Sequence, residues 1–175
     1  MLIDLSEILS LNGEVKNLIF DFESDKFDTG HSIYPFTGEC QCICKFIKQQ
    51  DKKIYLSSSL KAGLIIPCDR CLKDVVINFN FSDEKEIDIS ENFGQHLEEL
   101  NEMPYIDGFS FDSEKYIHNE LMLNMPVKVL CNENCKGICQ KCGKNLNEGE
   151  CHCDTTDLDP RMSKVLDVFN QFKEV

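Results

Sequence analysis

Six of the eleven cysteines in this chain fall between residues 131 and 153, in the stretch CNENCKGICQKCGKNLNEGECHC. The stretch is rich in Gly and Asn and contains no long apolar run, so it cannot fold around a hydrophobic core of its own. A catalytic nucleophile needs one thiol and a disulfide needs two, whereas metal ions are commonly bound by four cysteines. The density of cysteines therefore predicts a segment that a metal ion holds in shape.

Within this stretch the clearest ligand pair is Cys139-x-x-Cys142, followed by Gly143. The two-residue spacing lets both sulfur atoms point at one ion, and glycine at the next position admits the turn that directs backbone N–H groups toward the thiolates. A structural zinc ion takes four ligands, so four of the six cysteines suffice. The candidate ligands are Cys131, Cys135, Cys139, Cys142, Cys151 and Cys153. An iron–sulfur cluster and free surface thiols are the alternatives.

The expected role of this zinc is structural, and the chain is not expected to be an enzyme. A catalytic zinc would leave an open coordination position beside an acid or base, and the sequence contains neither HExxH nor HxE…PCxxC. It also lacks the G-x-S-x-G and GxxxxGK[ST] motifs. The histidines lie in four different sequence contexts, at His31, His96, His118 and His152.

A second Cys-x-x-Cys pair, Cys68-Asp69-Arg70-Cys71, lies in an expected turn between two strands. This pair fits half of a metal site, a redox pair, or a tight turn with two buried side chains. A thioredoxin-like motif would instead stand at the start of a helix in a βαβ pattern, which the surroundings do not supply.

The fold class that the sequence predicts is α+β, an antiparallel β-meander or small barrel-like sheet with a helix packed on it. Strands are expected at 18–22, 36–47, 54–66 and 75–81, where apolar residues recur with a period of two. On the second of these, Cys40, Cys42 and Cys44 share one face with two phenylalanines and are expected in the core.

Beyond the strands, residues 83–110 are expected to form a long acidic loop with a little helix. A helix is expected from Asp112 or Ser113 to about Asn124, with Ile117, Leu121 and Asn124 on its buried side. A final amphipathic helix is expected over 159–172, with Asp159 as its N-cap and Pro160 at its first position. The predicted division is 1–126, a sheet domain with the Cys68–Cys71 turn and the acidic loop 82–110, and 127–175, the Cys-rich segment plus the final helix.

The net charge is −13, but it is unevenly spread: residues 82–120 are strongly acidic, whereas residues 40–75 carry a net positive charge. A contact with a polyanion is therefore expected near the two cysteine-bearing regions. The first residues carry acids where a signal peptide would carry lysines, and no segment approaches the roughly 18 consecutive apolar residues of a membrane span. A cytoplasmic location is expected, where clustered thiols stay reduced and bind metal.

Several of these motifs, in this order, resemble the YceD family, whose members are described as large ribosomal RNA subunit accumulation proteins. The motifs are PCDRCL (67–72), ELMLNMPVKVLC (120–131), CKGICQKCGKNLN (135–147), CHC (151–153) and DPRMSKVLDVF (159–169). The likeness is to a branch with a Cys-rich C-terminal part. It implies a bacterial, non-enzymatic factor that supports synthesis, processing or stability of large-subunit ribosomal RNA. The family's CxRC motif falls on Cys68, Arg70 and Cys71, and no catalytic residue is implied.

Direct contact with ribosomal RNA would need a basic face on this acidic chain. Such a face is hypothesised around the Cys68–Cys71 turn, with Arg70, Cys68, Cys71, Lys45, Lys52 and Lys73 as contact residues. The acidic charge fits equally well a ribosome-assembly protein that mediates the effect. The alternative function is a thiol-based redox sensor, since Arg70 beside two thiols favours the thiolate.

Overall fold

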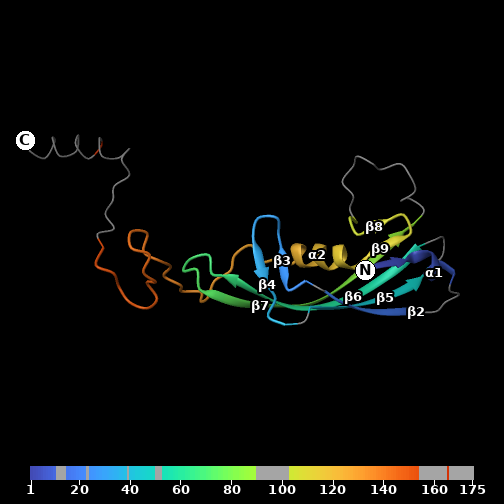
Figure 1. Cartoon of the computed structure of the whole chain (residues 1–175), viewed down its shortest axis with the longest axis horizontal. Helices are drawn as coiled ribbons and strands as arrows, with labels where there is room; N and C mark the ends of the chain where they lie inside the picture. The colour runs from blue at the N-terminus through green and yellow to red at the C-terminus, as the bar shows by residue number, and fades with distance from the viewer. Residues whose placement is uncertain are drawn as a thin grey trace, which may run out of the picture.

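Alternating apolar and polar residues build a central antiparallel sheet of four strands in the order β2-β5-β6-β7 (Figure 1). The computed structural model describes residues 1–10, 15–22, 24–38, 40–49, 53–89, 103–153 and residue 165. The elements are β1 (Leu2–Asp4), α1 (Leu5–Ser10), β2 (Val15–Asp21), β3 (Lys26–Asp28), β4 (Ile33–Pro35), β5 (Gln41–Lys48), β6 (Lys53–Pro67), β7 (Asp74–Asp88), β8 (Ile106–Asp107), β9 (Ser110–Asp112) and α2 (Ser113–Leu123). Two smaller antiparallel sheets, β1-β9-β8 and β3-β4, accompany it.

The register of the central sheet follows the predicted alternation. Cys44 lies opposite Leu18 on β2 and Ser58 on β6, and Phe46 lies opposite Leu56. Cys42, Cys44 and Phe46 are fully buried, which confirms the expectation that these cysteines pack in the core.

The central sheet is open, so the barrel-like alternative is wrong. Among the described residues, β2 pairs only with β5 and β7 pairs only with β6. Four strands are too few to close around a packed interior, for which about eight are typical. The antiparallel meander is the part of the prediction that the structure confirms.

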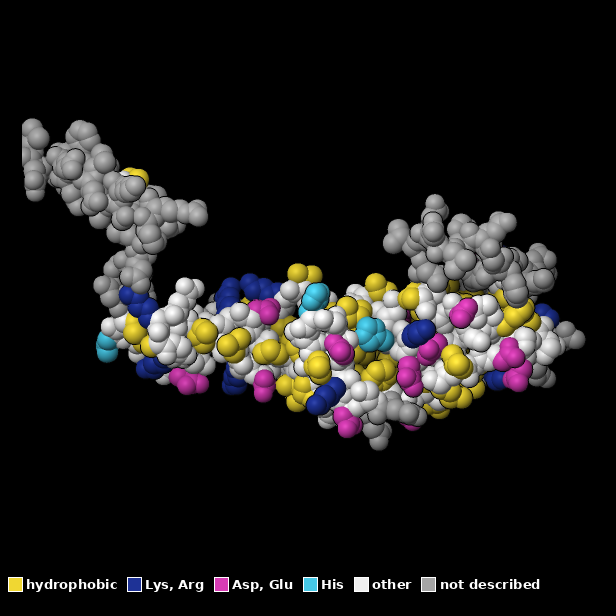
Figure 2. Space-filling model, turned by 45° about the horizontal axis from the view of Figure 1, so that its top comes forward, with side chains coloured by type: hydrophobic (Ala, Val, Ile, Leu, Met, Phe, Trp, Pro, Cys, Tyr) yellow, Lys and Arg dark blue, Asp and Glu magenta, His cyan; other side chains and the backbone are white. Residues whose placement is uncertain are grey.

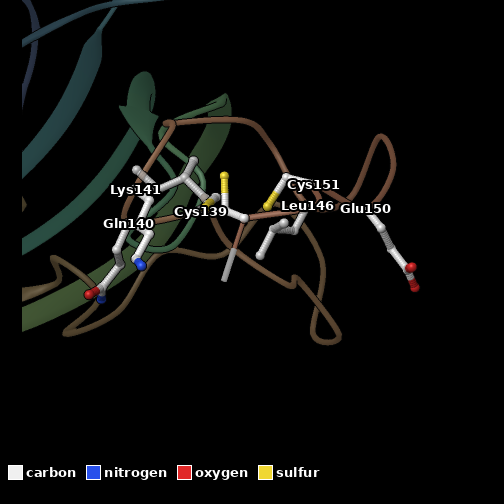
Figure 3. A pocket seen from close by; sticks show the side chains of 8 residues that line it. Cys139, Gln140, Lys141, Leu146, Glu150 and Cys151 are labelled. Atoms are coloured by element: carbon white, nitrogen blue, oxygen red, sulfur yellow. The ribbon is translucent and has the colours of Figure 1, made fainter. Parts of the chain in front are cut away.

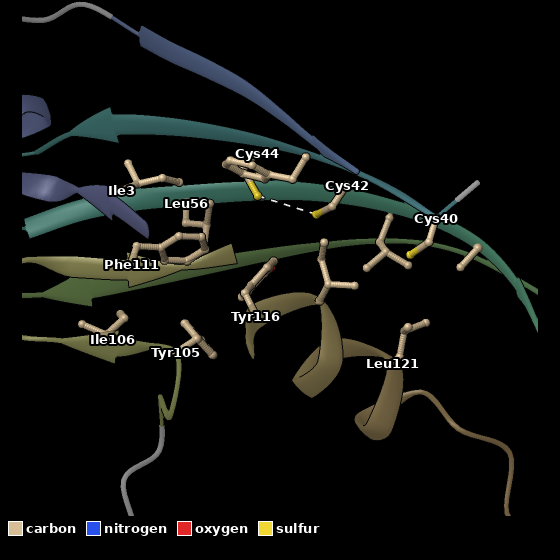
Figure 4. Close-up of a cluster of buried hydrophobic side chains, with 14 of the residues drawn as sticks. Ile3, Cys40, Cys42, Cys44, Leu56, Tyr105, Ile106, Phe111, Tyr116 and Leu121 are labelled. Atoms are coloured by element: carbon tan, nitrogen blue, oxygen red, sulfur yellow. Dashed lines mark hydrogen bonds between the residues drawn. The ribbon is translucent and has the colours of Figure 1, made fainter. Parts of the chain in front are cut away.

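One face of the sheet is covered by α2 and by the sheet β1-β9-β8, which together enclose the core (Figures 1 and 4). Aromatic rings take part in this contact. Phe111 of β9 meets Phe46 edge-on with ring centroids 5.3 Å apart, and Tyr105 meets Tyr116 of α2 at 4.9 Å. Such edge-to-face pairs add to the apolar area that they bury.

Helix α2 begins where the sequence predicts it. The Asp112 carboxylate accepts hydrogen bonds from the backbone N–H groups of Glu114 and Lys115, which would otherwise lack partners in the first turn. Asn124 is the C-cap and is exposed, so its expected place on the buried side was wrong. The buried side is instead made by Ser113, Tyr116, Ile117, Glu120 and Leu121.

The predicted loop 83–110 is wrong at both ends, because β7 continues to Asp88 and because β8 and the start of β9 fall within residues 106–110. Residues 83–88 are acidic, yet they alternate: Lys85 and Ile87 lie opposite Leu56 and Ile54 and face the core side. Period-two burial, rather than composition, decides the strand. The middle of the predicted loop, residues 90–102, lies outside the described residues.

At the start of the chain, β1 and α1 were not predicted. They pack onto the core through Leu5 and Ile8, which are fully buried. The predicted final helix, apart from Val165, lies outside the described residues. In the part of the chain that the structure describes, no helix has the length and apolar character that crossing a membrane requires.

Candidate metal centre

The connection between β6 and β7 is a tight turn that carries Cys68 and Cys71. The backbone N–H of Cys68 donates to the Lys73 carbonyl at 2.8 Å, and the N–H of Leu72 donates to the Cys68 carbonyl at 2.9 Å. Leu72 has φ of 61°, a left-handed conformation that favours glycine. This closed turn places the thiols of Cys68 and Cys71 at the end of the long β6–β7 hairpin.

The same turn occurs a second time at Cys139 and Cys142. The N–H of Cys139 donates to the Lys144 carbonyl at 2.8 Å, and the N–H of Gly143 donates to the Cys139 carbonyl at 2.8 Å. Gly143 takes the left-handed conformation, with φ of 72°, at the position equivalent to Leu72. Two segments far apart in the sequence therefore form the same metal-binding type of turn.

The structure brings the Cys68–Cys71 turn together with two cysteines about 60 residues further along. The inner cysteine group consists of Cys68, Cys71, Cys131 and Cys135, whose sulfur atoms all lie within 4.8 Å of one another. The sulfur–sulfur distances are 3.9 Å between Cys68 and Cys135 and 3.4 Å between Cys71 and Cys131. Tetrahedral zinc with Zn–S bonds of 2.3 Å needs sulfur atoms about 3.8 Å apart, so the group fits such an ion.

The second turn gathers four sulfur atoms in the same way. The outer cysteine group consists of Cys139, Cys142, Cys151 and Cys153, again with all sulfur atoms within 4.8 Å of one another. Cys139 and Cys151 line one pocket (Figure 3). The sequence predicts one metal site with four ligands among six cysteines. The structure divides those six between two groups and adds Cys68 and Cys71, for which spacing alone had left several roles open.

Two side chains of the Cys68–Cys71 turn fasten it to the Cys-rich segment. The Asp69 carboxylate accepts from the backbone N–H of Val129 at 2.7 Å, and Arg70 Nη1 donates to the Cys135 carbonyl at 2.8 Å. Gly137, with φ of 81°, lies so close that a Cβ atom there would stand 3.1 Å from the Arg70 carbonyl oxygen. Arg70, hypothesised to face a partner, thus contributes to this junction.

Hydrogen bonds from backbone amides favour ionisation of Cys68 in the inner group and of Cys139 in the outer group. Burial alone would raise the pKa of Cys68, but hydrogen bonds from the backbone N–H groups of Cys131, Arg70 and Cys71 lower it to about 6. In the outer group, the backbone N–H of Cys142 and the thiol of Cys151 lower the pKa of Cys139 to about 6.

Burial alone would also raise the pKa of Cys135, but hydrogen bonds from the Asn147 side chain and the Gly137 backbone lower it. Two other thiols behave in the opposite way. A hydrogen bond to Cys71 raises the pKa of Cys131 to about 12, and one to Cys142 raises the pKa of Cys153 to about 12. Without a metal ion the four thiols of a group share protons, whereas a bound cation would favour all four thiolates.

The lysines of the hypothesised basic face do not gather around the Cys68–Cys71 turn. Lys73 lies beside the turn, but Lys45 lies opposite Ser57 on the exposed face of the sheet. Ser57 and Pro67 are ten residues apart on β6, about 33 Å at 3.3 Å per residue. Lys52 lies outside the described residues. On the face shown in Figure 2, Lys and Arg side chains are most frequent toward the Cys-rich end.

The three other cysteines lie apart from both groups. Cys42 and Cys44 are fully buried under the sheet with their sulfur atoms 3.6 Å apart (Figure 4). Burial raises the pKa of Cys40 to about 12. Cys40 therefore stays protonated at neutral pH, and all three cysteines serve as small apolar side chains in the core.

The left-handed position after the second cysteine gives a direct test of the inner turn. Leu72 is exposed, so Leu72→Gly removes little buried area and is expected to retain metal and stability within about 1 kcal/mol. Leu72→Val forces a β-branched residue into φ of 61°, which costs about 1–2 kcal/mol of backbone strain. Because this strain opposes the metal-bound turn, the variant is expected to bind metal about tenfold more weakly. Competitive zinc titration measures both. Equal affinity of the two variants would contradict the assignment of this turn as a ligand-bearing element.

Comparison with known proteins adds to this geometry. The model of the family described as large ribosomal RNA subunit accumulation protein YceD matches residues 56–169. The chain is 26% identical over 152 residues to the protein named large ribosomal RNA subunit accumulation protein YCED homolog 1, chloroplastic, of Arabidopsis thaliana, covering 72% of this chain and 47% of that protein. It is 42% identical over 43 residues to the protein of the same name from Zea mays, covering 24% of this chain and 15% of that protein.

The chain thus spans about half the length of the Arabidopsis relative, and its match to the maize protein covers a smaller part of that protein. No solved structure matches it. The family match includes every cysteine of both groups, since they run from Cys68 to Cys153.

Proposed function

Because this chain belongs to the YceD family, we propose that it is a non-enzymatic factor that supports the accumulation of large-subunit ribosomal RNA. The observation that carries the proposal is that the matched region contains the whole metal-binding architecture. The match to a protein named for large ribosomal RNA subunit accumulation supports the same role. We place the chain in the cytoplasm of a bacterial cell, where the cysteine groups would remain reduced.

The proposal of a non-enzymatic role is supported by how the described polar groups are used. His118, the histidine on α2, contacts the Asp28 carbonyl at 2.7 Å and packs against the Phe27 ring, so it is part of the fold. The two ionisable side chains of the Cys68–Cys71 turn, Asp69 and Arg70, bond to backbone groups across the junction. These contacts are typical of structural residues rather than of an acid–base pair held near a substrate.

Zinc is the metal that we propose for both groups. Each group offers four cysteine sulfur atoms within 4.8 Å of one another, and each contains a Cys-x-x-Cys turn of the type found in structural zinc sites. When bound, zinc would supply cross-links that the Cys-rich segment cannot obtain from apolar contacts. Elemental analysis of protein purified without added metal tests this. Two zinc ions per chain are expected. Iron together with sulfide, in place of zinc, would instead identify an iron–sulfur cluster.

The proposed partner is large-subunit ribosomal RNA or a ribosome-assembly protein bound to it, and the proposed contact lies at the Cys-rich end. Support comes from charge: toward this end Lys and Arg side chains are most frequent on the face shown in Figure 2. Exposed Lys73 and Lys136 belong to the two segments that the inner cysteine group joins. A phosphate backbone would contact such side chains in a salt-dependent manner.

Depletion of the protein from its own cells tests the function. The expected result is a fall in large-subunit ribosomal RNA of about twofold or more relative to small-subunit RNA, restored by the wild-type chain. Pulse-labelling of RNA and gradient sedimentation of subunits measure it. An unchanged ratio of the two RNAs in fully depleted cells would refute the proposed function.

A redox sensor remains the second candidate, because one observation favours it. Backbone and thiol hydrogen bonds lower the pKa of Cys139 to about 6, and its neighbour Cys142 is exposed. Low-pKa, accessible thiolates are the ones that oxidise first. This candidate predicts reversible disulfide formation in cells under mild peroxide, detected by mass spectrometry, with ribosomal RNA levels unaffected by depletion.

A further inference from the structure

We propose that the two cysteine groups exchange their zinc ions at different rates. The inner group retains its ion, whereas the outer group releases and rebinds its ion while the sheet stays folded. This inference rests on the proposed function in one respect, that both groups bind zinc. Beyond that, it makes the outer group an exchangeable metal site and states what reaches it, namely a small thiol or chelating ligand.

Burial separates the two groups most clearly. In the inner group Cys68, Cys71 and Cys135 are 0%, 6% and 3% exposed. In the outer group Cys142 is exposed, and Cys151 and Cys153 are half-buried. The remaining ligands are exceptions, since Cys131 of the inner group is half-buried and Cys139 of the outer group is 4% exposed. An incoming ligand can therefore reach three of the four outer sulfur atoms from solvent, whereas three of the four inner ones are covered.

The surroundings of the outer group provide a route of access. A cavity of about 500 Å³ is lined by Cys139, Cys151, Cys153, Gln140, Lys141 and Glu150 (Figure 3). The cavity is thus lined by three of the four ligands and by three polar residues, of which Glu150 directs its carboxylate away from the sulfur atoms (Figure 3). A small molecule that carries a thiolate or carboxylates could bind there and compete for the ion by ligand exchange.

The ligands of the inner group are anchored more firmly. Cys68 and Cys71 sit on the turn of a hairpin whose strands are 15 residues each and paired along their whole length. Cys135 is held from two sides, by Arg70 at its carbonyl and by Asn147 Nδ2, 3.3 Å from its sulfur. Release of the inner ion therefore requires local unfolding of this junction.

The outer ligands depend on a short loop instead. Cys151 and Cys153 follow the turn at residues 145–149, and just before them Lys144 Nζ donates to the Glu150 carbonyl at 2.9 Å. Lys144 is itself exposed, so this contact opens readily. Opening it separates Cys151 and Cys153 from Cys139 without disturbing the hairpin.

The two groups can act independently because they take their ligands from successive stretches. Residues 135–147 connect them through backbone bonds such as Leu146 N–H to the Gly137 carbonyl at 2.9 Å. None of the inner ligands lies beyond Cys135, and none of the outer ligands precedes Cys139. Loss of the outer ion therefore leaves the inner ligand set complete.

A chelator chase on the full chain tests the inference. Zinc-loaded protein is mixed with excess pyridylazo resorcinol dye, and release is followed by absorbance. The expected result is two phases of equal amplitude, the first faster by about tenfold or more, since slow release requires a local opening that costs free energy. Cys142→Ser is expected to abolish the fast phase and keep the slow one, whereas Cys71→Ser is expected to abolish the slow one.

Native mass spectrometry with a heavy zinc isotope gives a second readout that needs no variant. An intermediate with one light and one heavy ion should accumulate before full exchange. A single phase for both ions, no mixed intermediate, or retention of the fast phase in Cys142→Ser would overturn the inference. Failure of the proposed function is a separate outcome, because an unchanged ribosomal RNA ratio on depletion leaves these exchange phases as they are.

Discussion

Replacing Cys71 with serine is expected to remove one metal ion and to release residues 128–138 from the end of the sheet, while the four-stranded sheet remains folded. The inner cysteine group joins segments separated by about 60 residues. Beside its own cysteines, the apolar side chains of the described residues that pack there are Val75, Leu130 and Ile138, all partly exposed. Structural zinc contributes on the order of 10–16 kcal/mol in small metal-bound units, far more than three half-buried side chains.

Hydrogen exchange followed by mass spectrometry measures this release. Protection of residues 128–138 should fall by about two orders of magnitude or more, with β5, β6 and β7 unchanged, because each 1.4 kcal/mol of opening free energy is a factor of about ten. Elemental analysis should show one zinc fewer. Retention of both ions, or collapse of protection throughout the sheet, would contradict the role assigned to the inner group.

Cys40→Ala is the matched control for this experiment. Cys40 is 3% exposed and belongs to neither group, so its loss removes buried sulfur but no ligand. The variant is expected to keep both metal ions and to lower the free energy of unfolding by about 1 kcal/mol. Comparison of the two variants separates the loss of a ligand from the loss of a buried side chain.

The central sheet and α2 could be predicted from the sequence because their signals are local. Period-two alternation from Ile54 to Ile66 and the cap at Asp112 each depend on residues within a few positions of one another. The acidic run 83–88 was misjudged because charge suggested a loop, although Ile87 already continued the alternation of β7.

The division of the cysteines could not be predicted in the same way. Spacing shows that Cys68 and Cys71 can share an ion, but not that Cys131 and Cys135 complete the set, since that depends on how the chain returns to the β6–β7 turn. One signal was present: eight cysteines in the turn and the Cys-rich stretch equal two sets of four. A second signal would have been the likeness of the two Cys-x-x-Cys turns. It was obscured because Gly143 takes the left-handed position after the second cysteine in one turn, whereas Leu72 takes it in the other.

The buried ion pair between β7 and α2 is expected to give the second large effect, this time on the sheet domain. Glu120 is 2% exposed, and its carboxylate accepts a hydrogen bond from Lys85 Nζ. The same ammonium lies 3.0 Å from Asp83 and over the rings of Tyr105 and Tyr116, at 5.5 and 5.4 Å from their centroids. Together these contacts fix α2 beneath the sheet.

Protonation of Lys85 follows from this setting. Burial alone would lower the pKa of Lys85, but the hydrogen bonds with Glu120 and Asp83 raise it above its ordinary value. A raised folded-state pKa means that the stabilising contribution is fully present below the unfolded value of about 10.4 and is lost only as the pH rises beyond it. The pair therefore contributes throughout the neutral range.

Glu120→Ala is accordingly expected to lower the free energy of unfolding by about 3 kcal/mol at neutral pH, because it leaves the Lys85 charge in an apolar setting with only Asp83 as a partner. Urea unfolding measures the change. The double variant Lys85→Met with Glu120→Leu should recover most of it, since apolar residues of similar volume can replace a buried pair. Lys115→Ala, on the exposed side of the same helix, should stay within about 0.5 kcal/mol of the wild type. A single variant as stable as Lys115→Ala would show that aromatic packing alone holds α2 in place.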